Sequence, residues 1–395
     1  MNVEQFKIWL PLIGLTCATF VFNTSEFIPI GLLTDIAKDF EISESHAGLL
    51  ITVYAWVVAL TSLPLMLLAS KIEFRKLLLS IVVLFIISHL FSAVASNFSL
   101  LMASRVGVAC AHAIFWSITP PLAVRIAPEG QKSTALSIIM AGTSVAMVIG
   151  LPLGRIIGLH TGWRTTFFCI AAVTFLIFIL LAVVFPKVPV RNQTSLKHIP
   201  TLLKQKKLMC IYITTVILVT GHYTGYSYIE PFLGQVARMN DGMVTLSLII
   251  FGLVGMVGSF LFAKFYPTHP YNLIKGSIIV ITLMLLWMRF SAYNVYTAVL
   301  LCAFWGTAIV VYNLAFQAKI IEYAPQATAV AMSVYSGIFN LGIGTGALAG
   351  GIVCSNLSLH FIGYAGGIIA LAATIYCLQE ALPIFKLSSK TTTHN

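Results

Sequence analysis

Twelve long apolar runs constrain this chain more than any other feature of its sequence. A helix that crosses the hydrocarbon core of a bilayer needs about 20 predominantly apolar residues. The runs fall at 8–33, 47–69, 77–95, 98–123, 134–158, 164–186, 209–233, 243–263, 272–290, 295–318, 327–354 and 358–383. Because they are continuous and do not alternate between apolar and polar residues, they predict α-helices and not the strands of a membrane barrel. The expected fold class is all-α integral membrane, with 12 transmembrane helices.

The composition supports a protein embedded in lipid. Of the 395 residues, 59% are hydrophobic and 9% are charged, whereas a soluble domain carries about 25% charged residues. The 23 Lys and Arg residues outnumber the 12 Asp and Glu residues. They lie in short gaps between apolar runs, so no nucleic-acid partner is expected. The seven cysteines are scattered and predict neither a metal site nor a disulfide framework. The first apolar run is too long for the core of a cleavable signal peptide and is expected to stay in the protein.

The basic residues predict the orientation in the membrane. If the N-terminus lies in the cytoplasm, 17 of the 23 Lys and Arg residues fall on the cytoplasmic side. Loops on that side of membrane proteins are enriched in Lys and Arg. Both termini are therefore expected to be cytoplasmic.

A polar stretch divides the apolar runs into two sets of six. It predicts an N-terminal six-helix bundle at 1–186, a basic cytoplasmic linker at 187–208, and a C-terminal six-helix bundle with a short cytoplasmic tail at 209–395.

The two halves also share a motif. In each half an Ala-Pro pair precedes an Ala-x-Ser sequence, and two glycines follow the serine after 13 and 17 residues. The positions are Ala127, Pro128, Ser137, Gly150 and Gly154 in the first half, and Ala324, Pro325, Ser333, Gly346 and Gly350 in the second. The repetition favours a duplicated, pseudo-symmetric architecture. Transporters are often built from such repeats, with the solute held at their interface near the middle of the membrane.

Several motifs resemble those of the major facilitator superfamily. The segment Ser70–Lys76 is similar to its cytoplasmic loop signature, Arg105 matches the arginine of its fourth-helix motif, and Gly150–Gly154 resembles the glycine and proline motif of antiporters. Longer strings, at 22–33, 54–60, 112–119, 222–232 and 336–340, resemble bacterial sugar efflux transporters of the drug:proton antiporter group. The resemblance implies a major facilitator fold in the bacterial cell inner membrane. It also implies proton-driven export of arabinose-like sugars and thiogalactoside analogues.

The loop signature departs from the family pattern at two positions. Ser70 stands where the family usually has Asp, and Glu73 stands where it has Gly. If that Asp normally takes part in a charge lock of the outward-facing state, the lock is altered here.

Glu26 is the candidate proton-coupling acid. A charge at the bilayer centre costs at least about 2.5–3.5 kcal/mol on insertion scales, so an acid deep in an apolar run suggests function. Asn23 lies three residues earlier, on the same helical face, and is a candidate sugar ligand. The alternative is a structural acid that is hydrogen-bonded to a neighbouring helix.

The fourth apolar run presents a second polar face. Arg105, His112 and Trp116 recur there at helical spacing, and Arg105 is the one basic residue expected deep inside a first-half helix. Arg105 could hold an acid such as Glu26 or organise backbone carbonyls. His112 could carry a proton or donate to a sugar hydroxyl. Trp116 offers an aromatic plane to a sugar, and ordinary packing is the alternative for all three.

The second half supplies further candidates for sugar binding. His222, Tyr226 and Glu230 follow one another at spacings of four residues on the seventh helix, and Glu230 could also take part in proton coupling. Because Pro231 follows, Glu230 could instead mark the end of that helix. The amides of Asn313, Gln317 and Asn340 suit hydroxyl-rich ligands, but they serve equally well in contacts between helices.

No nucleotide-binding motif or catalytic motif such as HExxH or GxSxG is present, so secondary transport is expected and an enzyme is not. The expected partners are a sugar, protons and lipid, with no cofactor and no metal, and a monomer is expected. One alternative is proton antiport of amphipathic drugs, which the 12% aromatic content also suits. The other is a sensor or intramembrane enzyme.

Overall fold

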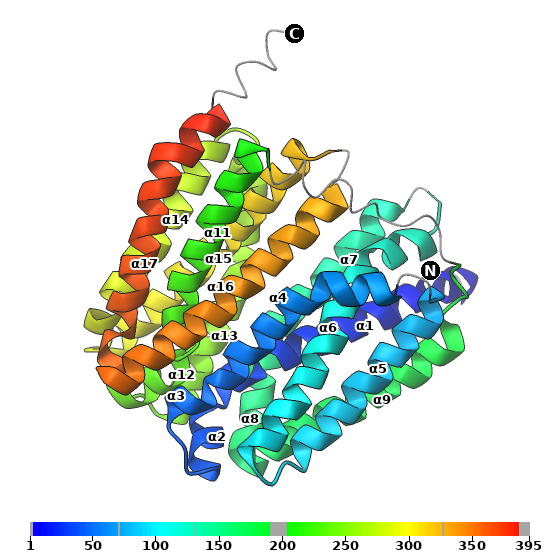
Figure 1. Ribbon diagram of the computed structural model, residues 1–395, viewed down its shortest axis with the longest axis horizontal. Helices are drawn as coiled ribbons and strands as arrows, with labels where there is room; N and C mark the ends of the chain where they lie inside the picture. Colours follow the sequence, from blue (N-terminus) through cyan, green and yellow to red (C-terminus); the bar gives the residue numbers. More distant parts are fainter. Residues whose placement is uncertain (1–2, 70–71, 130, 190–203, 326–327, 387–395) are drawn as a thin grey trace. The chain divides into compact units, whose positions relative to one another are not determined.

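The computed structural model describes residues 3–69, 72–129, 131–189, 204–325 and 328–386 (Figure 1). Residues 190–203 of the predicted linker and residues 387–395 of the predicted tail lie outside the described residues. Twelve helices among the described residues are long and apolar enough to span a membrane. They are Trp9–Gly31, Glu44–Ser62, Phe74–Ala93, Phe98–Pro120, Ala141–Thr161, Trp163–Val184, Lys206–Tyr226, Asp241–Phe265, Pro270–Ser291, Val295–Tyr323, Val330–Asn356 and Leu359–Lys386. The predicted all-α membrane fold is therefore confirmed.

Contacts along the chain define two units. The first comprises Met1–Ile42 and Val57–Gln193, and the second comprises Ser43–Trp56 and Thr194–Asn395. The helices from the first half of the sequence are α1 (Val3–Gly31), α2 (Leu33–Asp39), α3 (Glu44–Ala47), α4 (Leu49–Ala69), α5 (Phe74–Ala93), α6 (Phe98–Ile126), α7 (Lys132–Val145), η1 (Ala146–Gly150), α8 (Leu151–Thr161) and α9 (Trp163–Val184). Those from the second half are α11 (Lys206–Tyr226), α12 (Ile229–Pro231), η3 (Phe232–Val236), α13 (Asp241–Phe265), α14 (Pro270–Ser291), α15 (Val295–Tyr323), α16 (Thr328–Asn356), η4 (Leu359–Phe361), α17 (Ile362–Tyr376) and η5 (Cys377–Ala381).

Residues 43–56 differ from the predicted division, because their contacts group them with the second unit. Within that unit, α3 packs against α16, and the hydroxyls of Ser45 and Ser355 form a hydrogen bond. Trp56 Nε1 also donates to Thr345 Oγ1 at 3.4 Å. These contacts join residues about 300 positions apart in the sequence, and no local pattern signals them.

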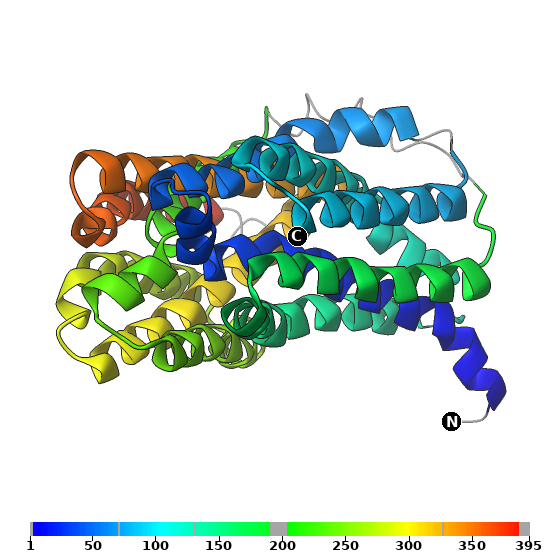
Figure 2. The same ribbon diagram turned by 90° about the horizontal axis from the view of Figure 1, so that it is seen from below.

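The first helix of each half is the most enclosed. About 67% of the α1 span and 72% of the α11 span is buried, against 33% for α9 and 17% for α13. In the second unit α11 packs against both α16 and α17 (Figure 1; Figure 2). By contrast, α9 and α13 expose large apolar side chains such as Val183 and Phe260, as lipid-facing helices do. Polar groups on α1 and α11 are therefore held inside their units.

The repeated glycines occupy matching positions in the two units. A Cβ at Gly150, the counterpart of Gly346, would overlap Thr24 Oγ1 of α1. A Cβ at Gly346 would lie 2.5 Å from the carbonyl oxygen of Thr220 on α11. Small residues let helix backbones approach closely in membranes. The shared motif thus encodes close packing on the first helix of each half, in agreement with the predicted pseudo-symmetry.

We expect Gly346→Ala to lower the free energy of unfolding by about 1–3 kcal/mol, because the contacting atom is a backbone oxygen that cannot rotate away. Gly276→Ala is the matched control. Gly276 is an exposed residue of α14, and an added Cβ there would have no atom within 4 Å. Because alanine favours a helix over glycine by up to about 1 kcal/mol, this variant should not be destabilised. Thermal unfolding in detergent compares the two variants. Equal melting temperatures would contradict the packing role.

Candidate transport site

Glu26 and Asn23 lie inside the first unit on α1. The Glu26 side chain is 11% exposed, and Asn23 is buried. Asn23 Nδ2 donates to the Thr19 carbonyl at 2.8 Å and lies 3.4 Å from Thr143 Oγ1 on α7. One face of an enclosed helix thus carries an acid and an amide, as predicted. Their roles in coupling and binding stay predictions.

A proline explains why polar partners gather at this point of α1. Pro29 has no N–H, so the carbonyl of Ser25, four residues earlier, lacks its helical donor. Arg105 on α6 supplies the missing hydrogen bond, because its Nη2 donates to that carbonyl at 3.0 Å. Its Nη1 donates to Ser25 Oγ, also at 3.0 Å. Arg105 is fully buried, and these bonds show it organising a backbone carbonyl, one of its two predicted roles.

His89 on α5 extends this hydrogen-bonded network. Its Nδ1 lies 2.8 Å from the Phe85 carbonyl, which can only accept, so Nδ1 carries a proton. Its Nε2 lies 2.7 Å from Ser25 Oγ. With a neutral imidazole, the three hydrogen bonds run in one direction: Arg105 donates to Ser25, Ser25 donates to His89, and His89 donates to Phe85. The network fixes α1 one residue before Glu26.

His112 faces the acid from α6. Its Nε2 lies 3.7 Å from Glu26 Oε2, a distance that gives an ion pair when the imidazole is protonated. The imidazole is buried between the rings of Phe22 and Trp116, with centroids 6.2 and 6.3 Å away. The acid and the imidazole therefore lie close together beside aromatic side chains. Trp116 is half-buried.

An aromatic cluster surrounds the predicted residues of α11. The rings of His222 and Tyr226 stack at 5.3 Å, and Tyr226 stacks on Phe251 of α13 at 4.6 Å. Trp305 of α15 meets His222 edge-on at 5.2 Å. Among the described residues, His222 Nδ1 and Trp305 Nε1 have no hydrogen-bond partner. The cluster therefore combines aromatic faces with polar atoms that can still form hydrogen bonds.

The predicted helical stripe is wrong at its last member, Glu230. Helix α11 ends at Tyr226, and Tyr228 adopts φ −116° and ψ 20° before α12 begins. Pro231 cannot donate to the carbonyl of Ser227, and the chain turns at Ser227 and Tyr228 before the short helix α12 that contains Pro231. Glu230 is buried in α12, but it does not prolong the face of His222 and Tyr226 along one helix.

One of the three candidate amides of the second unit joins two helices. Asn313 Oδ1 accepts a hydrogen bond from the Tyr335 hydroxyl on α16 at 2.9 Å, and it also accepts one from Gln317 Nε2 on its own helix at 3.1 Å. The bond to Tyr335 gives Asn313 a contact between α15 and α16. Asn340 Nδ2 donates to the Ser336 carbonyl at 3.0 Å, whereas its buried Oδ1 has no partner among the described residues. Asn340 therefore keeps an acceptor for a ligand.

Sequence reasoning missed several buried residues. Arg155 was not expected inside the first half, yet it is 1% exposed and its Nη1 donates to the Gly31 carbonyl at 2.6 Å. Arg155 is therefore a buried basic residue of the first half that the sequence did not indicate. A proline four residues after Ser25 could have indicated the carbonyl that needs a donor. His89, a histidine inside an apolar run, could also have been noticed, whereas Trp305 gave no signal.

Comparison with known proteins identifies the family of this chain. Residues 15–331 match the sequence profile of the Major Facilitator Superfamily. The chain belongs to that superfamily. Membership confirms a multi-pass membrane transporter and not an enzyme.

Solved structures of other members share its fold. A bacterial homologue of the human lysosomal transporter Spinster, inward-facing and unoccupied, is 17% identical with a TM-score of 0.74, over 99% of this chain and 98% of that one. A D-xylose–proton symporter is 15% identical with a TM-score of 0.76, over 94% and 98%. A human organic anion transporter is 11% identical with a TM-score of 0.69, over 95% and 100%. At these identities the likeness concerns the fold alone.

The structure gives Glu73 a function in this major facilitator transporter. Its carboxylate accepts from the backbone N–H groups of Arg75 and Lys76, which begin α5, and from that of Val188 at 2.8 Å. Phe74 N–H donates back to the Val188 carbonyl. The acid that replaces the family's glycine thus joins α5 to the segment after α9. Ser70, the other departure, lies outside the described residues.

The pH dependence of stability should reveal this contact. Burial raises the pKa of Glu73, but the three N–H donors and the charge of Lys76 outweigh it and lower the pKa below its usual range. The contribution to stability is therefore complete above the unfolded-state pKa of about 4.3, and it is lost as pH falls through the folded-state pKa. We expect Glu73→Gln to destabilise the protein by on the order of 1 kcal/mol at pH 7, and less at pH 3.5. Thermal unfolding at both pH values measures the difference. The control is Glu129→Gln, which changes an exposed acid. A loss of stability in Glu73→Gln that is equal at both pH values would contradict the assignment.

Proposed function

We propose that this transporter exports small neutral sugars from the cytoplasm in exchange for protons, by alternating access. One observation carries the proposal: Glu26, inside a membrane span, lies 3.7 Å from the imidazole of His112. An antiporter needs a site that responds to both a proton and a solute. A carboxylate beside a histidine accepts a proton from one side of the membrane and releases it to the other.

The sugar part of the proposal is supported by sequence resemblance and by the chemistry of the polar groups. The motifs at 22–33 and 222–232 resemble sugar efflux transporter B of bacteria. In the first unit, Asn23, His112 and Trp116 offer an amide, an imidazole and an aromatic plane, the groups with which proteins bind sugars. In the second unit, His222, Tyr226, Glu230, Gln317 and Asn340 are the candidate ligands. We propose a monomer in the bacterial inner membrane, with both termini cytoplasmic.

The proposed cycle assigns different tasks to neighbouring residues. Deprotonated Glu26 accepts hydrogen bonds from sugar hydroxyls, and a proton arriving from outside removes its charge and releases the sugar. His112 is the nearest exchange partner for that proton. Arg105 donates to Ser25, so it holds α1 in place while Glu26 changes charge.

The energy of one proton is sufficient. A charge that moves down about 100 mV supplies about 2.3 kcal/mol. A tenfold sugar gradient requires about 1.4 kcal/mol. One proton for each sugar therefore sustains export against a gradient of more than tenfold.

Antiport of amphipathic drugs is the second candidate. The stacked rings of Tyr226 and Phe251, with Trp305 edge-on to both, favour it, because flat apolar molecules pack well on aromatic surfaces. In this case the proton chemistry of the first unit stays the same and the cargo differs.

Reconstituted liposomes that contain a pH-sensitive dye test both candidates. We expect added arabinose or a thiogalactoside to drive proton movement, and uphill sugar flux to stop when the pH gradient and voltage are collapsed. Sugar flux that is indifferent to both gradients would exclude antiport. Proton movement with amphipathic cations alone would establish the second candidate.

A further inference from the structure

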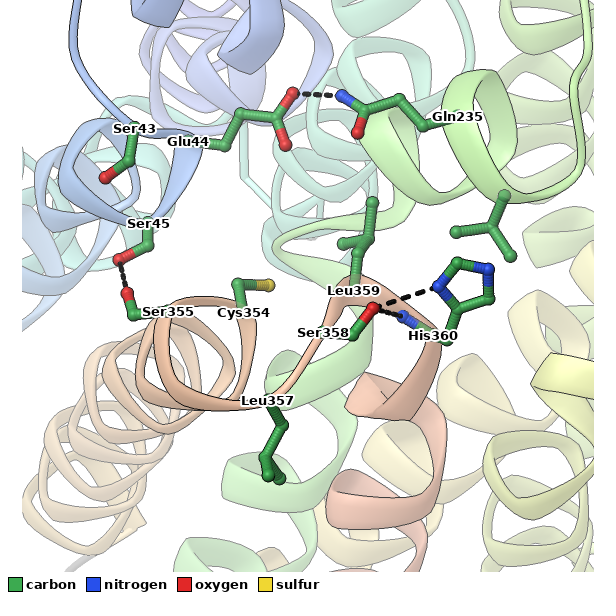
Figure 3. A pocket seen from close by; sticks show the side chains of 11 residues that line it. Ser43, Glu44, Ser45, Gln235, Cys354, Ser355, Leu357, Ser358, Leu359 and His360 are labelled. Carbon is green, nitrogen blue, oxygen red and sulfur yellow. Dashed lines mark hydrogen bonds between the residues drawn. The ribbon is translucent and has the colours of Figure 1, made fainter.

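A pocket of about 460 Å³ opens in the second unit, at the end where α11 and α16 finish (Figure 3). Its walls come from α3 and the residue before it, from η3, from the end of α16, and from η4 with the turn that precedes it. Small-molecule sites usually measure about 300–1,000 Å³, so the space accommodates a monosaccharide. None of the residues predicted for proton coupling or sugar binding lines this pocket.

Two hydrogen-bonded pairs of side chains line one side of the pocket. Gln235 Nε2 donates to the carboxylate of Glu44, and the hydroxyls of Ser45 and Ser355 bond to each other (Figure 3). A carboxylate accepts up to about four hydrogen bonds, and an amide or hydroxyl both donates and accepts. The lining on which these pairs lie therefore contains both hydrogen-bond donors and acceptors. Neighbouring hydroxyls of a sugar need such mixed donors and acceptors.

The lining also carries an imidazole and apolar groups. Ser358 Oγ lies 3.0 Å from His360 Nδ1 (Figure 3). The apolar residues Val236, Leu357 and Leu359 also line the pocket. The apolar side chains can cover the C–H face of a sugar ring, while the imidazole reaches a hydroxyl.

The charge of the lining selects among ligands. Of the described residues that line the pocket, Glu44 is the acid and none is Lys or Arg. Sugar phosphates and sugar acids are therefore disfavoured. Among the described residues, no three His, Cys, Asp or Glu side chains lie close enough to hold a metal ion.

We propose that this pocket is a second binding site for neutral polyols, separate from the site on α1 and α6. The inference rests on the proposed function insofar as the cargo is a sugar. Under the predicted orientation the pocket lies on the outer side of the membrane. It then holds a sugar after release from the proton-coupled site.

Protection of an engineered thiol tests the pocket. Ser355→Cys places a thiol of similar size on its exposed lining. Tyr293→Cys is the matched control, because Tyr293 follows α14 at the same end of the unit, is 84% exposed and does not line the pocket. In liposomes, mass spectrometry follows modification of each thiol by a membrane-impermeant methanethiosulfonate. We expect arabinose to slow modification severalfold in S355C and to leave Y293C unchanged.

Two additional variants locate the origin of the protection. Combining S355C with Glu44→Gln should weaken it, and combining S355C with Glu26→Gln should leave its half-saturating arabinose concentration unchanged. The proposal is overturned if arabinose does not protect S355C, or if protection disappears with Glu26→Gln. Protection without proton-coupled flux would support the pocket and defeat the proposed export, and flux without protection would do the reverse.

Discussion

Glu26→Gln is expected to abolish uphill sugar export while downhill sugar movement persists. The amide matches the carboxyl in size, so α1 and its contacts with α6 are retained, but it cannot bind and release a proton. The membrane voltage then no longer drives the cycle. At about 100 mV, the variant loses a sugar gradient of up to about 50-fold that one proton per sugar would support. Accumulation of radiolabelled arabinose in inverted membrane vesicles measures this loss.

The control is Glu41→Gln, which removes an exposed acid outside the spans. It should accumulate sugar as wild type does. His112→Gln should slow proton exchange without removing the acid, so we expect a lower rate and a smaller loss of gradient. Uphill accumulation in the Glu26 variant equal to wild type would show that another group carries the proton.

Arg105→Leu is expected to lower the free energy of unfolding by on the order of 3 kcal/mol. The substitution leaves the Ser25 carbonyl without a donor from α6, in a helix where Pro29 offers none. Ser25 Oγ and His89 lose the end of their network as well. Arg105→Lys keeps the charge, but an ammonium lacks the planar fork that reaches both oxygens, so we expect an intermediate loss.

A second substitution tests the cause of this destabilisation. Pro29→Ala restores an N–H four residues after Ser25, so the carbonyl regains a partner within its own helix. The double variant P29A/R105L should therefore be more stable than the sum of the single changes predicts. Thermal unfolding in detergent gives all four values of the cycle. Strict additivity would show that Arg105 stabilises the unit through other contacts.

Much of the fold could be predicted because the bilayer imposes a simple rule. Each span must be apolar and about 20 residues long. The runs at 164–186 and 272–290, for example, became α9 and α14 with ends shifted by only a few residues. The glycine motif was recognisable since close helix packing leaves little choice at Gly150 and Gly346. The grouping of residues 43–56 was not predicted, because it depends on hydrogen bonds between distant polar side chains.

The site could be predicted only where a single residue is unusual by itself. Glu26 and Arg105 stand out as charges in apolar runs. The partner of a buried group depends instead on how helices pack, so the bond between His89 and Ser25, 64 residues apart, was not visible. Glu230 was misplaced because a spacing of four residues has meaning only while the helix continues, and α11 ends at Tyr226.

The hydrogen bond that Arg105 donates across to α1 has a consequence for how this protein evolves. Pro29 creates the need for the bond and Arg105 meets it, so neither is neutral to lose alone. If the arginine is lost first, the Ser25 carbonyl has no donor and α1 is destabilised. If the proline is lost first, the restored backbone N–H competes with the buried Arg105 guanidinium for that same carbonyl. We therefore expect relatives of this chain to keep both residues or to lack both, so that two positions 76 residues apart are inherited as one character.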